Sequence, residues 1–386
     1  MEKIYYLALY LIGINNKLLV DIILNVPKKE VKNILLKDDL LQFQYMYNIN
    51  IEKYADKLLN KNIVKECIEK AENIVKLSKD YSIDIIAINN KRYPKILRDI
   101  DNPPALLHVK GKSITKSDQK AIACVGTRNA TTFGISAVNM IVKPLTKEKF
   151  TIVSGLATGI DAESHRVCLA NSGRTIAVLA HGLDQIYPKE NTELAKKILE
   201  NGGTLVSEYP IGTRIDKFRF VDRNRIIAGL SKGTVIFESK EKSGSMHTVN
   251  FALVNNRKVF CPVPTYKKES VLGLLQLINT KQAIPLYNQN DYRKILNTFG
   301  YKLNNNLEQT NKVKIECINT INQYNNQNSD LIKVLQNMQY DKYSTIKVNK
   351  EVSDIFKEIL KDNNLTMKEF INGVIVNIVS NYNKGE

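Results

Sequence analysis

The sequence has no apolar run that approaches the roughly 18 residues needed to span a bilayer. The five cysteines are scattered without a CxxC pair, and the four histidines show no ligand spacing. We therefore expect a reduced, cytoplasmic protein without disulfides, a metal site or a cofactor, and without a membrane partner. The N-terminal stretch MEKIYYLALYLIG lacks a small-residue cleavage site, so we expect an amphipathic helix and not a signal peptide.

The charge balance is strongly basic, with a formal net charge of +17. Residues 1–120 carry +6, residues 121–300 carry +10, and residues 301–386 carry only +1. This excess fits a polyanionic partner. A lysine-rich composition with no functional meaning would give the same balance. The 386 residues suggest two or three domains, since one domain takes about 100–200 residues.

The first part of the chain has helical periodicity. Apolar residues recur at helical spacing in residues 1–80, as at Leu7, Leu11, Leu18, Ile22 and Ile23. An extended stretch is expected at 83–88. Residues 89–112 hold Tyr93-Pro94 and Pro103-Pro104, which break helices, so this segment is predicted to be a connector.

Residues 120–290 have a different pattern, in which short aliphatic runs alternate with helical segments. The runs are AIACVG, FTIVSG, TIAVLA, GTLVSE, GTVIFE and KVFCPV. This alternation predicts βαβ units and a Rossmann-like parallel sheet of the α/β class. In such a sheet the ligand site lies at the carboxyl ends of the strands.

The segments after these runs carry the candidate site residues. Gly126, Thr127 and Arg128 follow the first run, where the glycine allows a tight turn and the guanidinium suits a phosphate. A plain surface turn is the alternative. The second run ends in SGLATGID, a glycine-rich helix start that is neither a Walker A loop nor GxGxxG. There we expect Asp161 to cap the following helix.

Two further segments point to anion binding. Residues 214–225 hold five cations and two phenylalanines, which suit phosphates and unpaired bases, although a solvated basic loop is the alternative. Ser243, Gly244 and Ser245 precede a helix expected to begin near His247. If the sheet forms as predicted, these helix starts converge on one sheet edge.

Taken together, the motifs resemble the DNA-processing protein A (DprA/Smf) family. The matching blocks are GTR, SGLATGIDAESH, YPKENTELA, SEYP, RNRIIAGLS and ESKEKSGSMHT, in the family's order over about residues 5–285. The resemblance implies a helical N-terminal domain (SAM-like or helix-hairpin-helix-like) before an extended Rossmann-like domain. It also implies binding of single-stranded DNA, loading of a RecA-type recombinase, protection of incoming DNA in transformation, and homodimers.

The resemblance also assigns site residues. It implies DNA contacts for Gly126, Thr127, Arg128, Ser154, Gly155, Ala157, Lys217, Phe220, Arg223, Asn224, Arg225, Ser243, Gly244 and Ser245. Arg128 and Arg225 are the principal candidates. The sequence departs from the family at Phe220-Val221-Asp222-Arg223, where the usual proline is missing, and after residue 262.

The C-terminal part departs further. The predicted domains are 1–80, 81–298, an Asn-rich linker at 299–340 and a module at 341–386. Residues 343–380 resemble a ribbon-helix-helix module, with Thr345, Lys347 and Asn349 facing a DNA groove. A helical hairpin used only for dimerisation is the alternative.

Three functions follow. The first is a non-catalytic single-strand binder, because no nucleophile–base pair or catalytic constellation is evident. The second is a nucleotide-binding or N-glycosidic-bond-cleaving enzyme with Glu208 or Glu238 acting near Arg128. The third is a regulator that binds duplex DNA through the C-terminal module.

Overall fold

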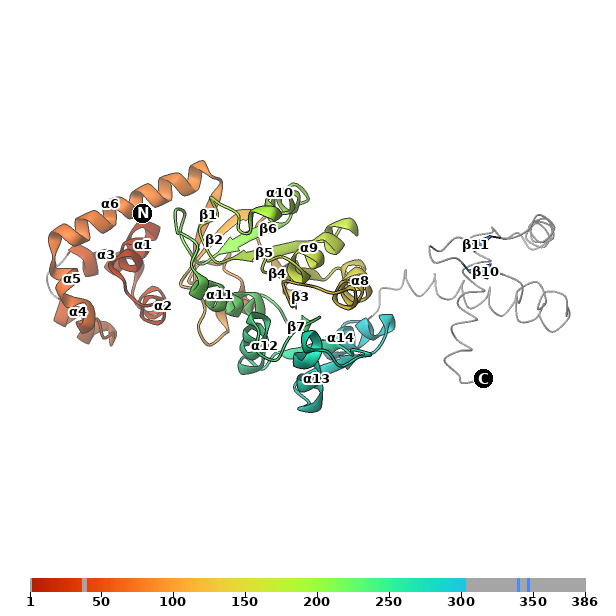
Figure 1. The fold of residues 1–386 in the computed structure, drawn as a ribbon. Helices are drawn as coiled ribbons and strands as arrows, with labels where there is room; N and C mark the ends of the chain where they lie inside the picture. Colours follow the sequence, from red (N-terminus) through yellow and green to blue (C-terminus); the bar gives the residue numbers. More distant parts are fainter. Residues whose placement is uncertain (1, 37–39, 303–338, 341–345, 348–386) are drawn as a thin grey trace. The chain divides into compact units, whose positions relative to one another are not determined.

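The computed structural model describes residues 2–36 and 40–302, together with the backbone of 339–340 and 346–347. The chain divides into two compact units, residues 1–301 and 302–386, which are considered separately. Figure 1 shows the first unit as helices at the N-terminal end followed by a sheet with helices around it. Within the described residues, no helix is long and apolar enough to cross a membrane.

The N-terminal region is helical, as predicted. Its helices are α1 (Glu2–Ile12), α2 (Asn16–Asn25), α3 (Lys28–Leu36), α4 (Leu40–Tyr47), α5 (Ala55–Leu59) and α6 (Lys61–Asp80). The Asn15 side chain caps α2 by accepting from the Leu18 N–H, and Asn60 caps α6 in the same way. Leu7, Ile22 and Ile23 are buried, which explains their helical spacing. The 20-residue α6 is longer than the short helices expected.

The core of the first unit is a mixed sheet, with nine strands among the described residues. Its parallel strands are β3 (Ala121–Val125), β4 (Thr151–Ser154), β5 (Thr175–Leu179), β6 (Thr204–Ser207), β7 (Gly233–Ile236), β8 (Lys258–Pro262) and β9 (Ile284–Leu286). All six predicted runs form strands here, so the α/β fold prediction is confirmed. β3 to β7 are buried along their whole length, as strands covered on both faces must be.

The connector prediction for residues 89–112 is wrong in part. β1 (Ile83–Ala87) pairs antiparallel with β2 (Leu106–Gly111), and β2 pairs antiparallel with β6. The two prolines at 103 and 104 do interrupt the chain, and α7 before them spans only Lys95–Arg98. The apolar residues that follow the prolines extend the sheet by a buried strand instead of linking two domains.

Helices cover the sheet in two groups. α8 (Thr132–Lys147), α9 (Ile160–Ala170) and α10 (Thr192–Glu200) pack in sequence, with α9 and α10 against β3 to β6. α11 (Lys217–Gly229) packs on α12 (Gly244–Val254), and both contact the sheet. α13 (Leu272–Asn279) and α14 (Tyr292–Thr298) complete the unit.

The strand order places β3 at a topological switch point. The order is β1-β2-β6-β5-β4-β3-β7-β8-β9, so the chain runs from β3 to one side of the sheet and later returns to its other side. Loops from neighbouring strands diverge at such a point and leave a crevice at the carboxyl ends of the strands. The crevice here lies where β3 and β7 end.

In the second unit, β10 (Gln339–Tyr340) pairs antiparallel with β11 (Ile346–Lys347) of the same chain. β11 lies within the strand that the ribbon-helix-helix prediction would pair between two chains. Thr345, Asn349, the side chain of Lys347 and the residues predicted to form the helices of this module lie outside the described residues. The module and the domain boundaries therefore stay predictions.

Candidate functional site

The loop after β3 is held between two other segments of the sheet edge. The Thr127 N–H donates to the Glu238 carbonyl oxygen at 2.8 Å, and the Ile160 N–H donates to the Thr127 carbonyl oxygen at 3.1 Å. A Cβ atom on Gly126 would lie 2.6 Å from Ile160 and 2.9 Å from the Glu238 carbonyl oxygen, so only glycine fits. Arg128 follows this clamped turn, and its side chain is exposed.

The loop after β4 is organised by Asp161. The buried Asp161 carboxylate accepts from the N–H groups of Gly155 (3.1 Å) and Ala157 (3.4 Å). Burial raises the pKa of this carboxyl, and nearby Arg223 opposes the effect. The expectation that Asp161 caps α9 is wrong, because its acceptor atoms face the preceding loop and Gly159 takes the cap position.

The first turns of α11 supply a cation and an aromatic ring. Asp216 caps the helix by accepting from the Phe218 N–H at 2.8 Å. Lys217 is exposed, and Phe220 is half-buried. The Arg128 guanidinium lies over the Phe220 ring, 5.8 Å from its centroid, and the centroids of the Tyr187 and Phe220 rings lie 5.7 Å apart.

The start of α12 presents a cluster of hydroxyls. The side-chain oxygens of Ser239, Ser243 and Ser245 lie 2.6, 2.8 and 3.0 Å from one another. α12 begins at Gly244, three residues before the predicted start at His247, so Ser243 is its N-cap residue and Ser245 lies in its first turn. Unpaired N–H groups at a helix start, together with hydroxyl donors, favour an anion.

These segments meet at one groove, which we call the strand-end groove. It has a volume of about 580 Å³. Eleven of the predicted site residues line it: Gly126, Thr127, Arg128, Ala157, Lys217, Phe220, Arg223, Asn224, Ser243, Gly244 and Ser245. The expected convergence of the helix starts on one sheet edge is therefore found.

A smaller hollow of about 210 Å³ adjoins the groove. We call it the side hollow; its lining is Arg128, Gly155, Ala157, Thr158, Tyr187, Pro188, Glu190 and Phe220. Tyr187 lines both spaces and was not among the predicted site residues. Its place at the head of the YPKENTELA block, beside other family blocks, was the signal that could have identified it.

Arg223 and Asn224 support the groove from beneath. The buried Arg223 guanidinium donates through Nη1 to the carbonyl oxygens of Gly155 (2.6 Å) and Val178. The Asn224 amide donates to the Gly244 carbonyl oxygen at 3.1 Å. Burial lowers the pKa of Arg223 to about 10, which leaves it charged at neutral pH. Both side chains are thus committed to holding the loops in place.

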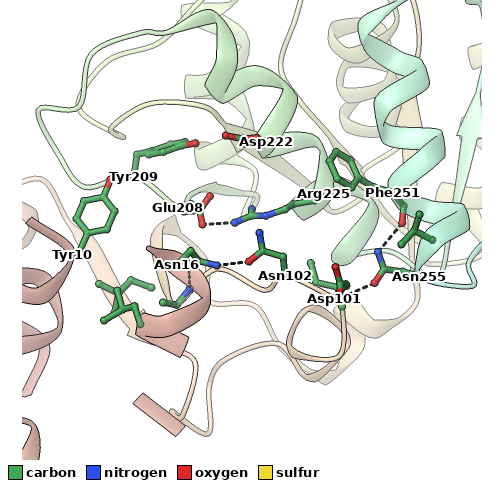
Figure 2. Close-up of a pocket in the computed structure, with 15 residues that line it drawn as sticks. Tyr10, Asn16, Asp101, Asn102, Glu208, Tyr209, Asp222, Arg225, Phe251 and Asn255 are labelled. Atoms are coloured by element: carbon green, nitrogen blue, oxygen red, sulfur yellow. Dashed lines mark hydrogen bonds and ion pairs between the residues drawn. The ribbon is translucent and has the colours of Figure 1, made fainter. Parts of the chain in front are cut away.

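Three predicted residues do not line the groove: Ser154, Arg225, and Gly155, which lines the side hollow instead. The Ser154 hydroxyl is buried and donates to the Cys124 carbonyl oxygen at 2.6 Å. Arg225, 6% exposed, pairs through Nη2 with Glu208 Oε1. This pair lies in a separate cavity of about 480 Å³, where residues of α1 and α2 meet α11 and α12 (Figure 2). Of the two principal candidates, Arg128 lines the strand-end groove and Arg225 does not.

The two candidate acid–base residues, Glu208 and Glu238, do not line the groove. Glu208 is in the Figure 2 cavity, paired with Arg225. Glu238 is fully buried, and its Oε2 accepts from the Thr131 N–H at 2.9 Å. A metal site would need three or more His, Cys, Asp or Glu side chains close together, and the described part of the chain has no such group.

Comparison with known proteins supports the resemblance to the DprA/Smf family. A sequence profile described as "DNA recombination-mediator protein A" matches residues 84–297. The chain is 41% identical to the DNA processing protein DprA of Bacillus subtilis over 200 residues, which cover 52% of this chain and 67% of that protein. It is 39% identical to Protein Smf of Synechocystis over 239 residues, covering 57% and 58% respectively. The matches thus span about two thirds or less of these relatives.

Solved structures agree with this match. The structure is similar to DprA of Streptococcus pneumoniae, with a TM-score of 0.57, 29% identity, and coverage of 77% of this chain and 97% of that one. It is also similar to DprA of Helicobacter pylori, with a TM-score of 0.51, 29% identity, and coverage of 56% and 97%. The Helicobacter structure is described by its mode of binding single-stranded DNA.

Proposed function

Because the chain belongs to the DNA recombination-mediator protein A family, we propose that it binds single-stranded DNA in the strand-end groove and acts in DNA processing. The family description names a mediator of recombination and not an enzyme. The observation that carries the proposal is the meeting of exposed cations, aromatic rings and helix starts at the switch point of the sheet.

The side chains of the groove suit an unpaired strand. Arg128 and Lys217 are exposed cations that can neutralise phosphates. The start of α12, with its serine hydroxyls, offers neutral donors for a further phosphate. Phe220 and Tyr187 line the groove with aromatic surface, on which a base can stack only when it is not paired. A duplex hides its base faces, so the groove favours single strands.

The alternative of a nucleotide-cleaving enzyme finds no support in the groove. Asp161, the carboxylate among the residues that line the groove, is buried and bound to two backbone N–H groups. Neither Glu208 nor the fully buried Glu238 lines the groove. Binding through phosphate contacts and stacking needs no general acid or base.

We extend the proposal to the finer roles that the family resemblance implies. These are the loading of a RecA-type recombinase, the protection of incoming DNA in transformation, and the formation of a homodimer. They rest on family membership and on the similarity to the DprA proteins of Bacillus and Streptococcus.

The test compares a fluorescent dT oligonucleotide with a matched duplex in anisotropy titrations at about 0.1 M salt. We expect the wild type to prefer the single strand and Arg128→Ala to lose most of this affinity. Arg166→Ala is the matched control, because Arg166 is an exposed arginine of α9 outside the groove. Affinity that is equal for both DNA forms, or untouched by Arg128→Ala, would reject the proposal.

A second arm tests the duplex-binding alternative. Protection of the gene's own upstream region by a fragment of residues 330–386 would favour a regulator whose C-terminal module reads duplex DNA. Binding that requires Arg128 and a single strand would favour the groove instead.

A further inference from the structure

The side hollow has the size and walls of a site for one flat ring. Its volume is about 210 Å³. Sites that enclose a whole drug-sized ligand measure roughly 300–1,000 Å³, so this one suits a fragment such as a single base. Tyr187, 41% exposed, and Phe220 supply aromatic surface to the lining, and Gly155 and Ala157 line the hollow as well.

The side hollow continues the strand-end groove. Arg128, Ala157, Tyr187 and Phe220 line both spaces, so they share a wall. A nucleotide whose phosphate lies beside Arg128 would therefore have its base within reach of the side hollow. An unpaired base can turn into such a space, whereas a base in a duplex cannot.

Glu190 distinguishes the side hollow from the rest of this basic surface. It lines the hollow, it is exposed, and its carboxylate makes no hydrogen bond or ion pair with another described residue. A carboxylate only accepts hydrogen bonds. It also repels phosphates, so its place beside a phosphate-binding groove is unfavourable unless the occupant brings N–H donors.

We propose that the side hollow is a base-reading subsite in which Glu190 accepts a hydrogen bond from the exocyclic amino group of an unpaired base. This inference rests on the proposed function, since it assumes that the groove binds single-stranded DNA. It assigns Glu190 as a specificity-determining residue and gives the protein a base preference at one position.

The chemistry of the bases sets the direction of the preference. Cytosine offers its N4 amino group, for which Glu and Asp are the usual acceptors, and adenine and guanine also carry amino groups. Thymine has no amino group and presents carbonyl oxygens there, which repel a carboxylate. Oligo-dC should therefore bind more tightly than oligo-dT of the same length and backbone charge.

The experiment measures the ratio of the dissociation constants for dT12 and dC12 by anisotropy, with the full chain at neutral pH. We expect the wild type to favour dC12 by about fivefold, the effect of one charge-assisted hydrogen bond at a partly exposed site. Glu190→Ala should bring the ratio close to one. The variant should bind both strands at least as well as the wild type overall, because a negative charge has been removed.

Glu193→Ala is the matched control. Glu193 is exposed three residues further along and does not line the hollow, so its removal changes the charge but not the ratio. Circular dichroism checks that each variant is folded. A wild-type ratio near one, or a ratio that persists in Glu190→Ala, overturns the base-reading role and leaves single-strand binding intact. Failure of the wild type to bind either strand overturns both proposals.

Discussion

Arg223 of α11 donates a 2.6 Å hydrogen bond to the carbonyl oxygen of Gly155 and so ties the loop after β4 to α11. A Cβ atom on Gly155 would collide with this guanidinium, so the pair requires a glycine on one side and a long cation on the other. Asp161 lies nearby and balances the buried charge. The floor of the groove is thus built from a buried ion and backbone groups.

Replacing Arg223 should first affect stability. Arg223→Met leaves the carbonyl oxygens of Gly155 and Val178 without this donor and leaves Asp161 without its neighbouring cation. We expect the free energy of unfolding to fall by about 3 kcal/mol. Denaturant unfolding measures this, with the exposed Arg214→Met as control. A loss no larger than in the control would contradict the supporting role.

The two phenylalanines of α11 form a matched pair for testing base stacking. Phe220 lines the groove, whereas Phe218 is 70% exposed and does not. Phe220→Ala should weaken binding of oligo-dT by about 1–3 kcal/mol, the contribution of one stacked base. Phe218→Ala should change it little. Equal effects in anisotropy titrations would show that Phe220 has no special contact with the DNA.

Arg225 is expected to contribute to the stability of the fold and not to DNA binding. Its ion pair with Glu208 lies in the cavity of Figure 2 and not in the groove. Arg225→Met should lower the free energy of unfolding by about 3 kcal/mol, because a partly buried carboxylate loses its partner. The double variant Arg225→Met/Glu208→Leu should recover part of this loss.

The affinity of Arg225→Met for single strands tests whether Arg225 lies outside the DNA-binding site. The folded fraction of Arg225→Met should bind oligo-dT within about twofold of the wild type, a change of less than ~0.5 kcal/mol. A large loss of affinity with intact folding would return Arg225 to the DNA site and show that the groove extends beyond the residues that line it here.

Buried histidines should make stability fall in acid. Burial lowers the pKa of His165 to about 3 and that of His108 to about 3, below their ordinary 6.5. Between pH 6.5 and pH 3 the unfolded chain binds protons that the folded chain does not. The contribution of these histidines to the free energy of unfolding is therefore complete above pH 6.5 and is lost as the pH falls towards 3. Each histidine contributes a slope of up to ~1.4 kcal/mol per pH unit.

Variants check this assignment. His165→Gln should reduce the pH slope of the unfolding free energy between pH 6 and pH 4, whereas the exposed His247→Gln should leave it unchanged. An unchanged slope in His165→Gln would mean that this histidine accepts a proton without unfolding.

Much of the fold could be predicted from local patterns. β3 to β8 form where short aliphatic runs alternate with helical segments, because a strand buried on both faces needs an unbroken apolar sequence. The loops after β3 and β4 and the start of α12 were predicted to converge because parallel strands bring their carboxyl ends to one edge. β2 was missed, since its apolar run after two prolines carries no sign of an antiparallel partner in β6.

Only tertiary packing decided which residues of α11 line the groove and which contact other parts of the fold. Arg223, Asn224 and Arg225 are consecutive, and successive residues on a helix point about 100° apart, so they cannot all face one groove. The charge pattern made all three candidates, but it carried no information on which face of α11 meets the sheet, α12 or the N-terminal helices. By itself the sequence determined β3 to β8, the loops that follow them and the positive charge at the groove. The packing of α11 buried Arg223 beneath the groove, turned Arg225 towards Glu208, and left Lys217 exposed in the groove, which Arg128 of the loop after β3 also lines.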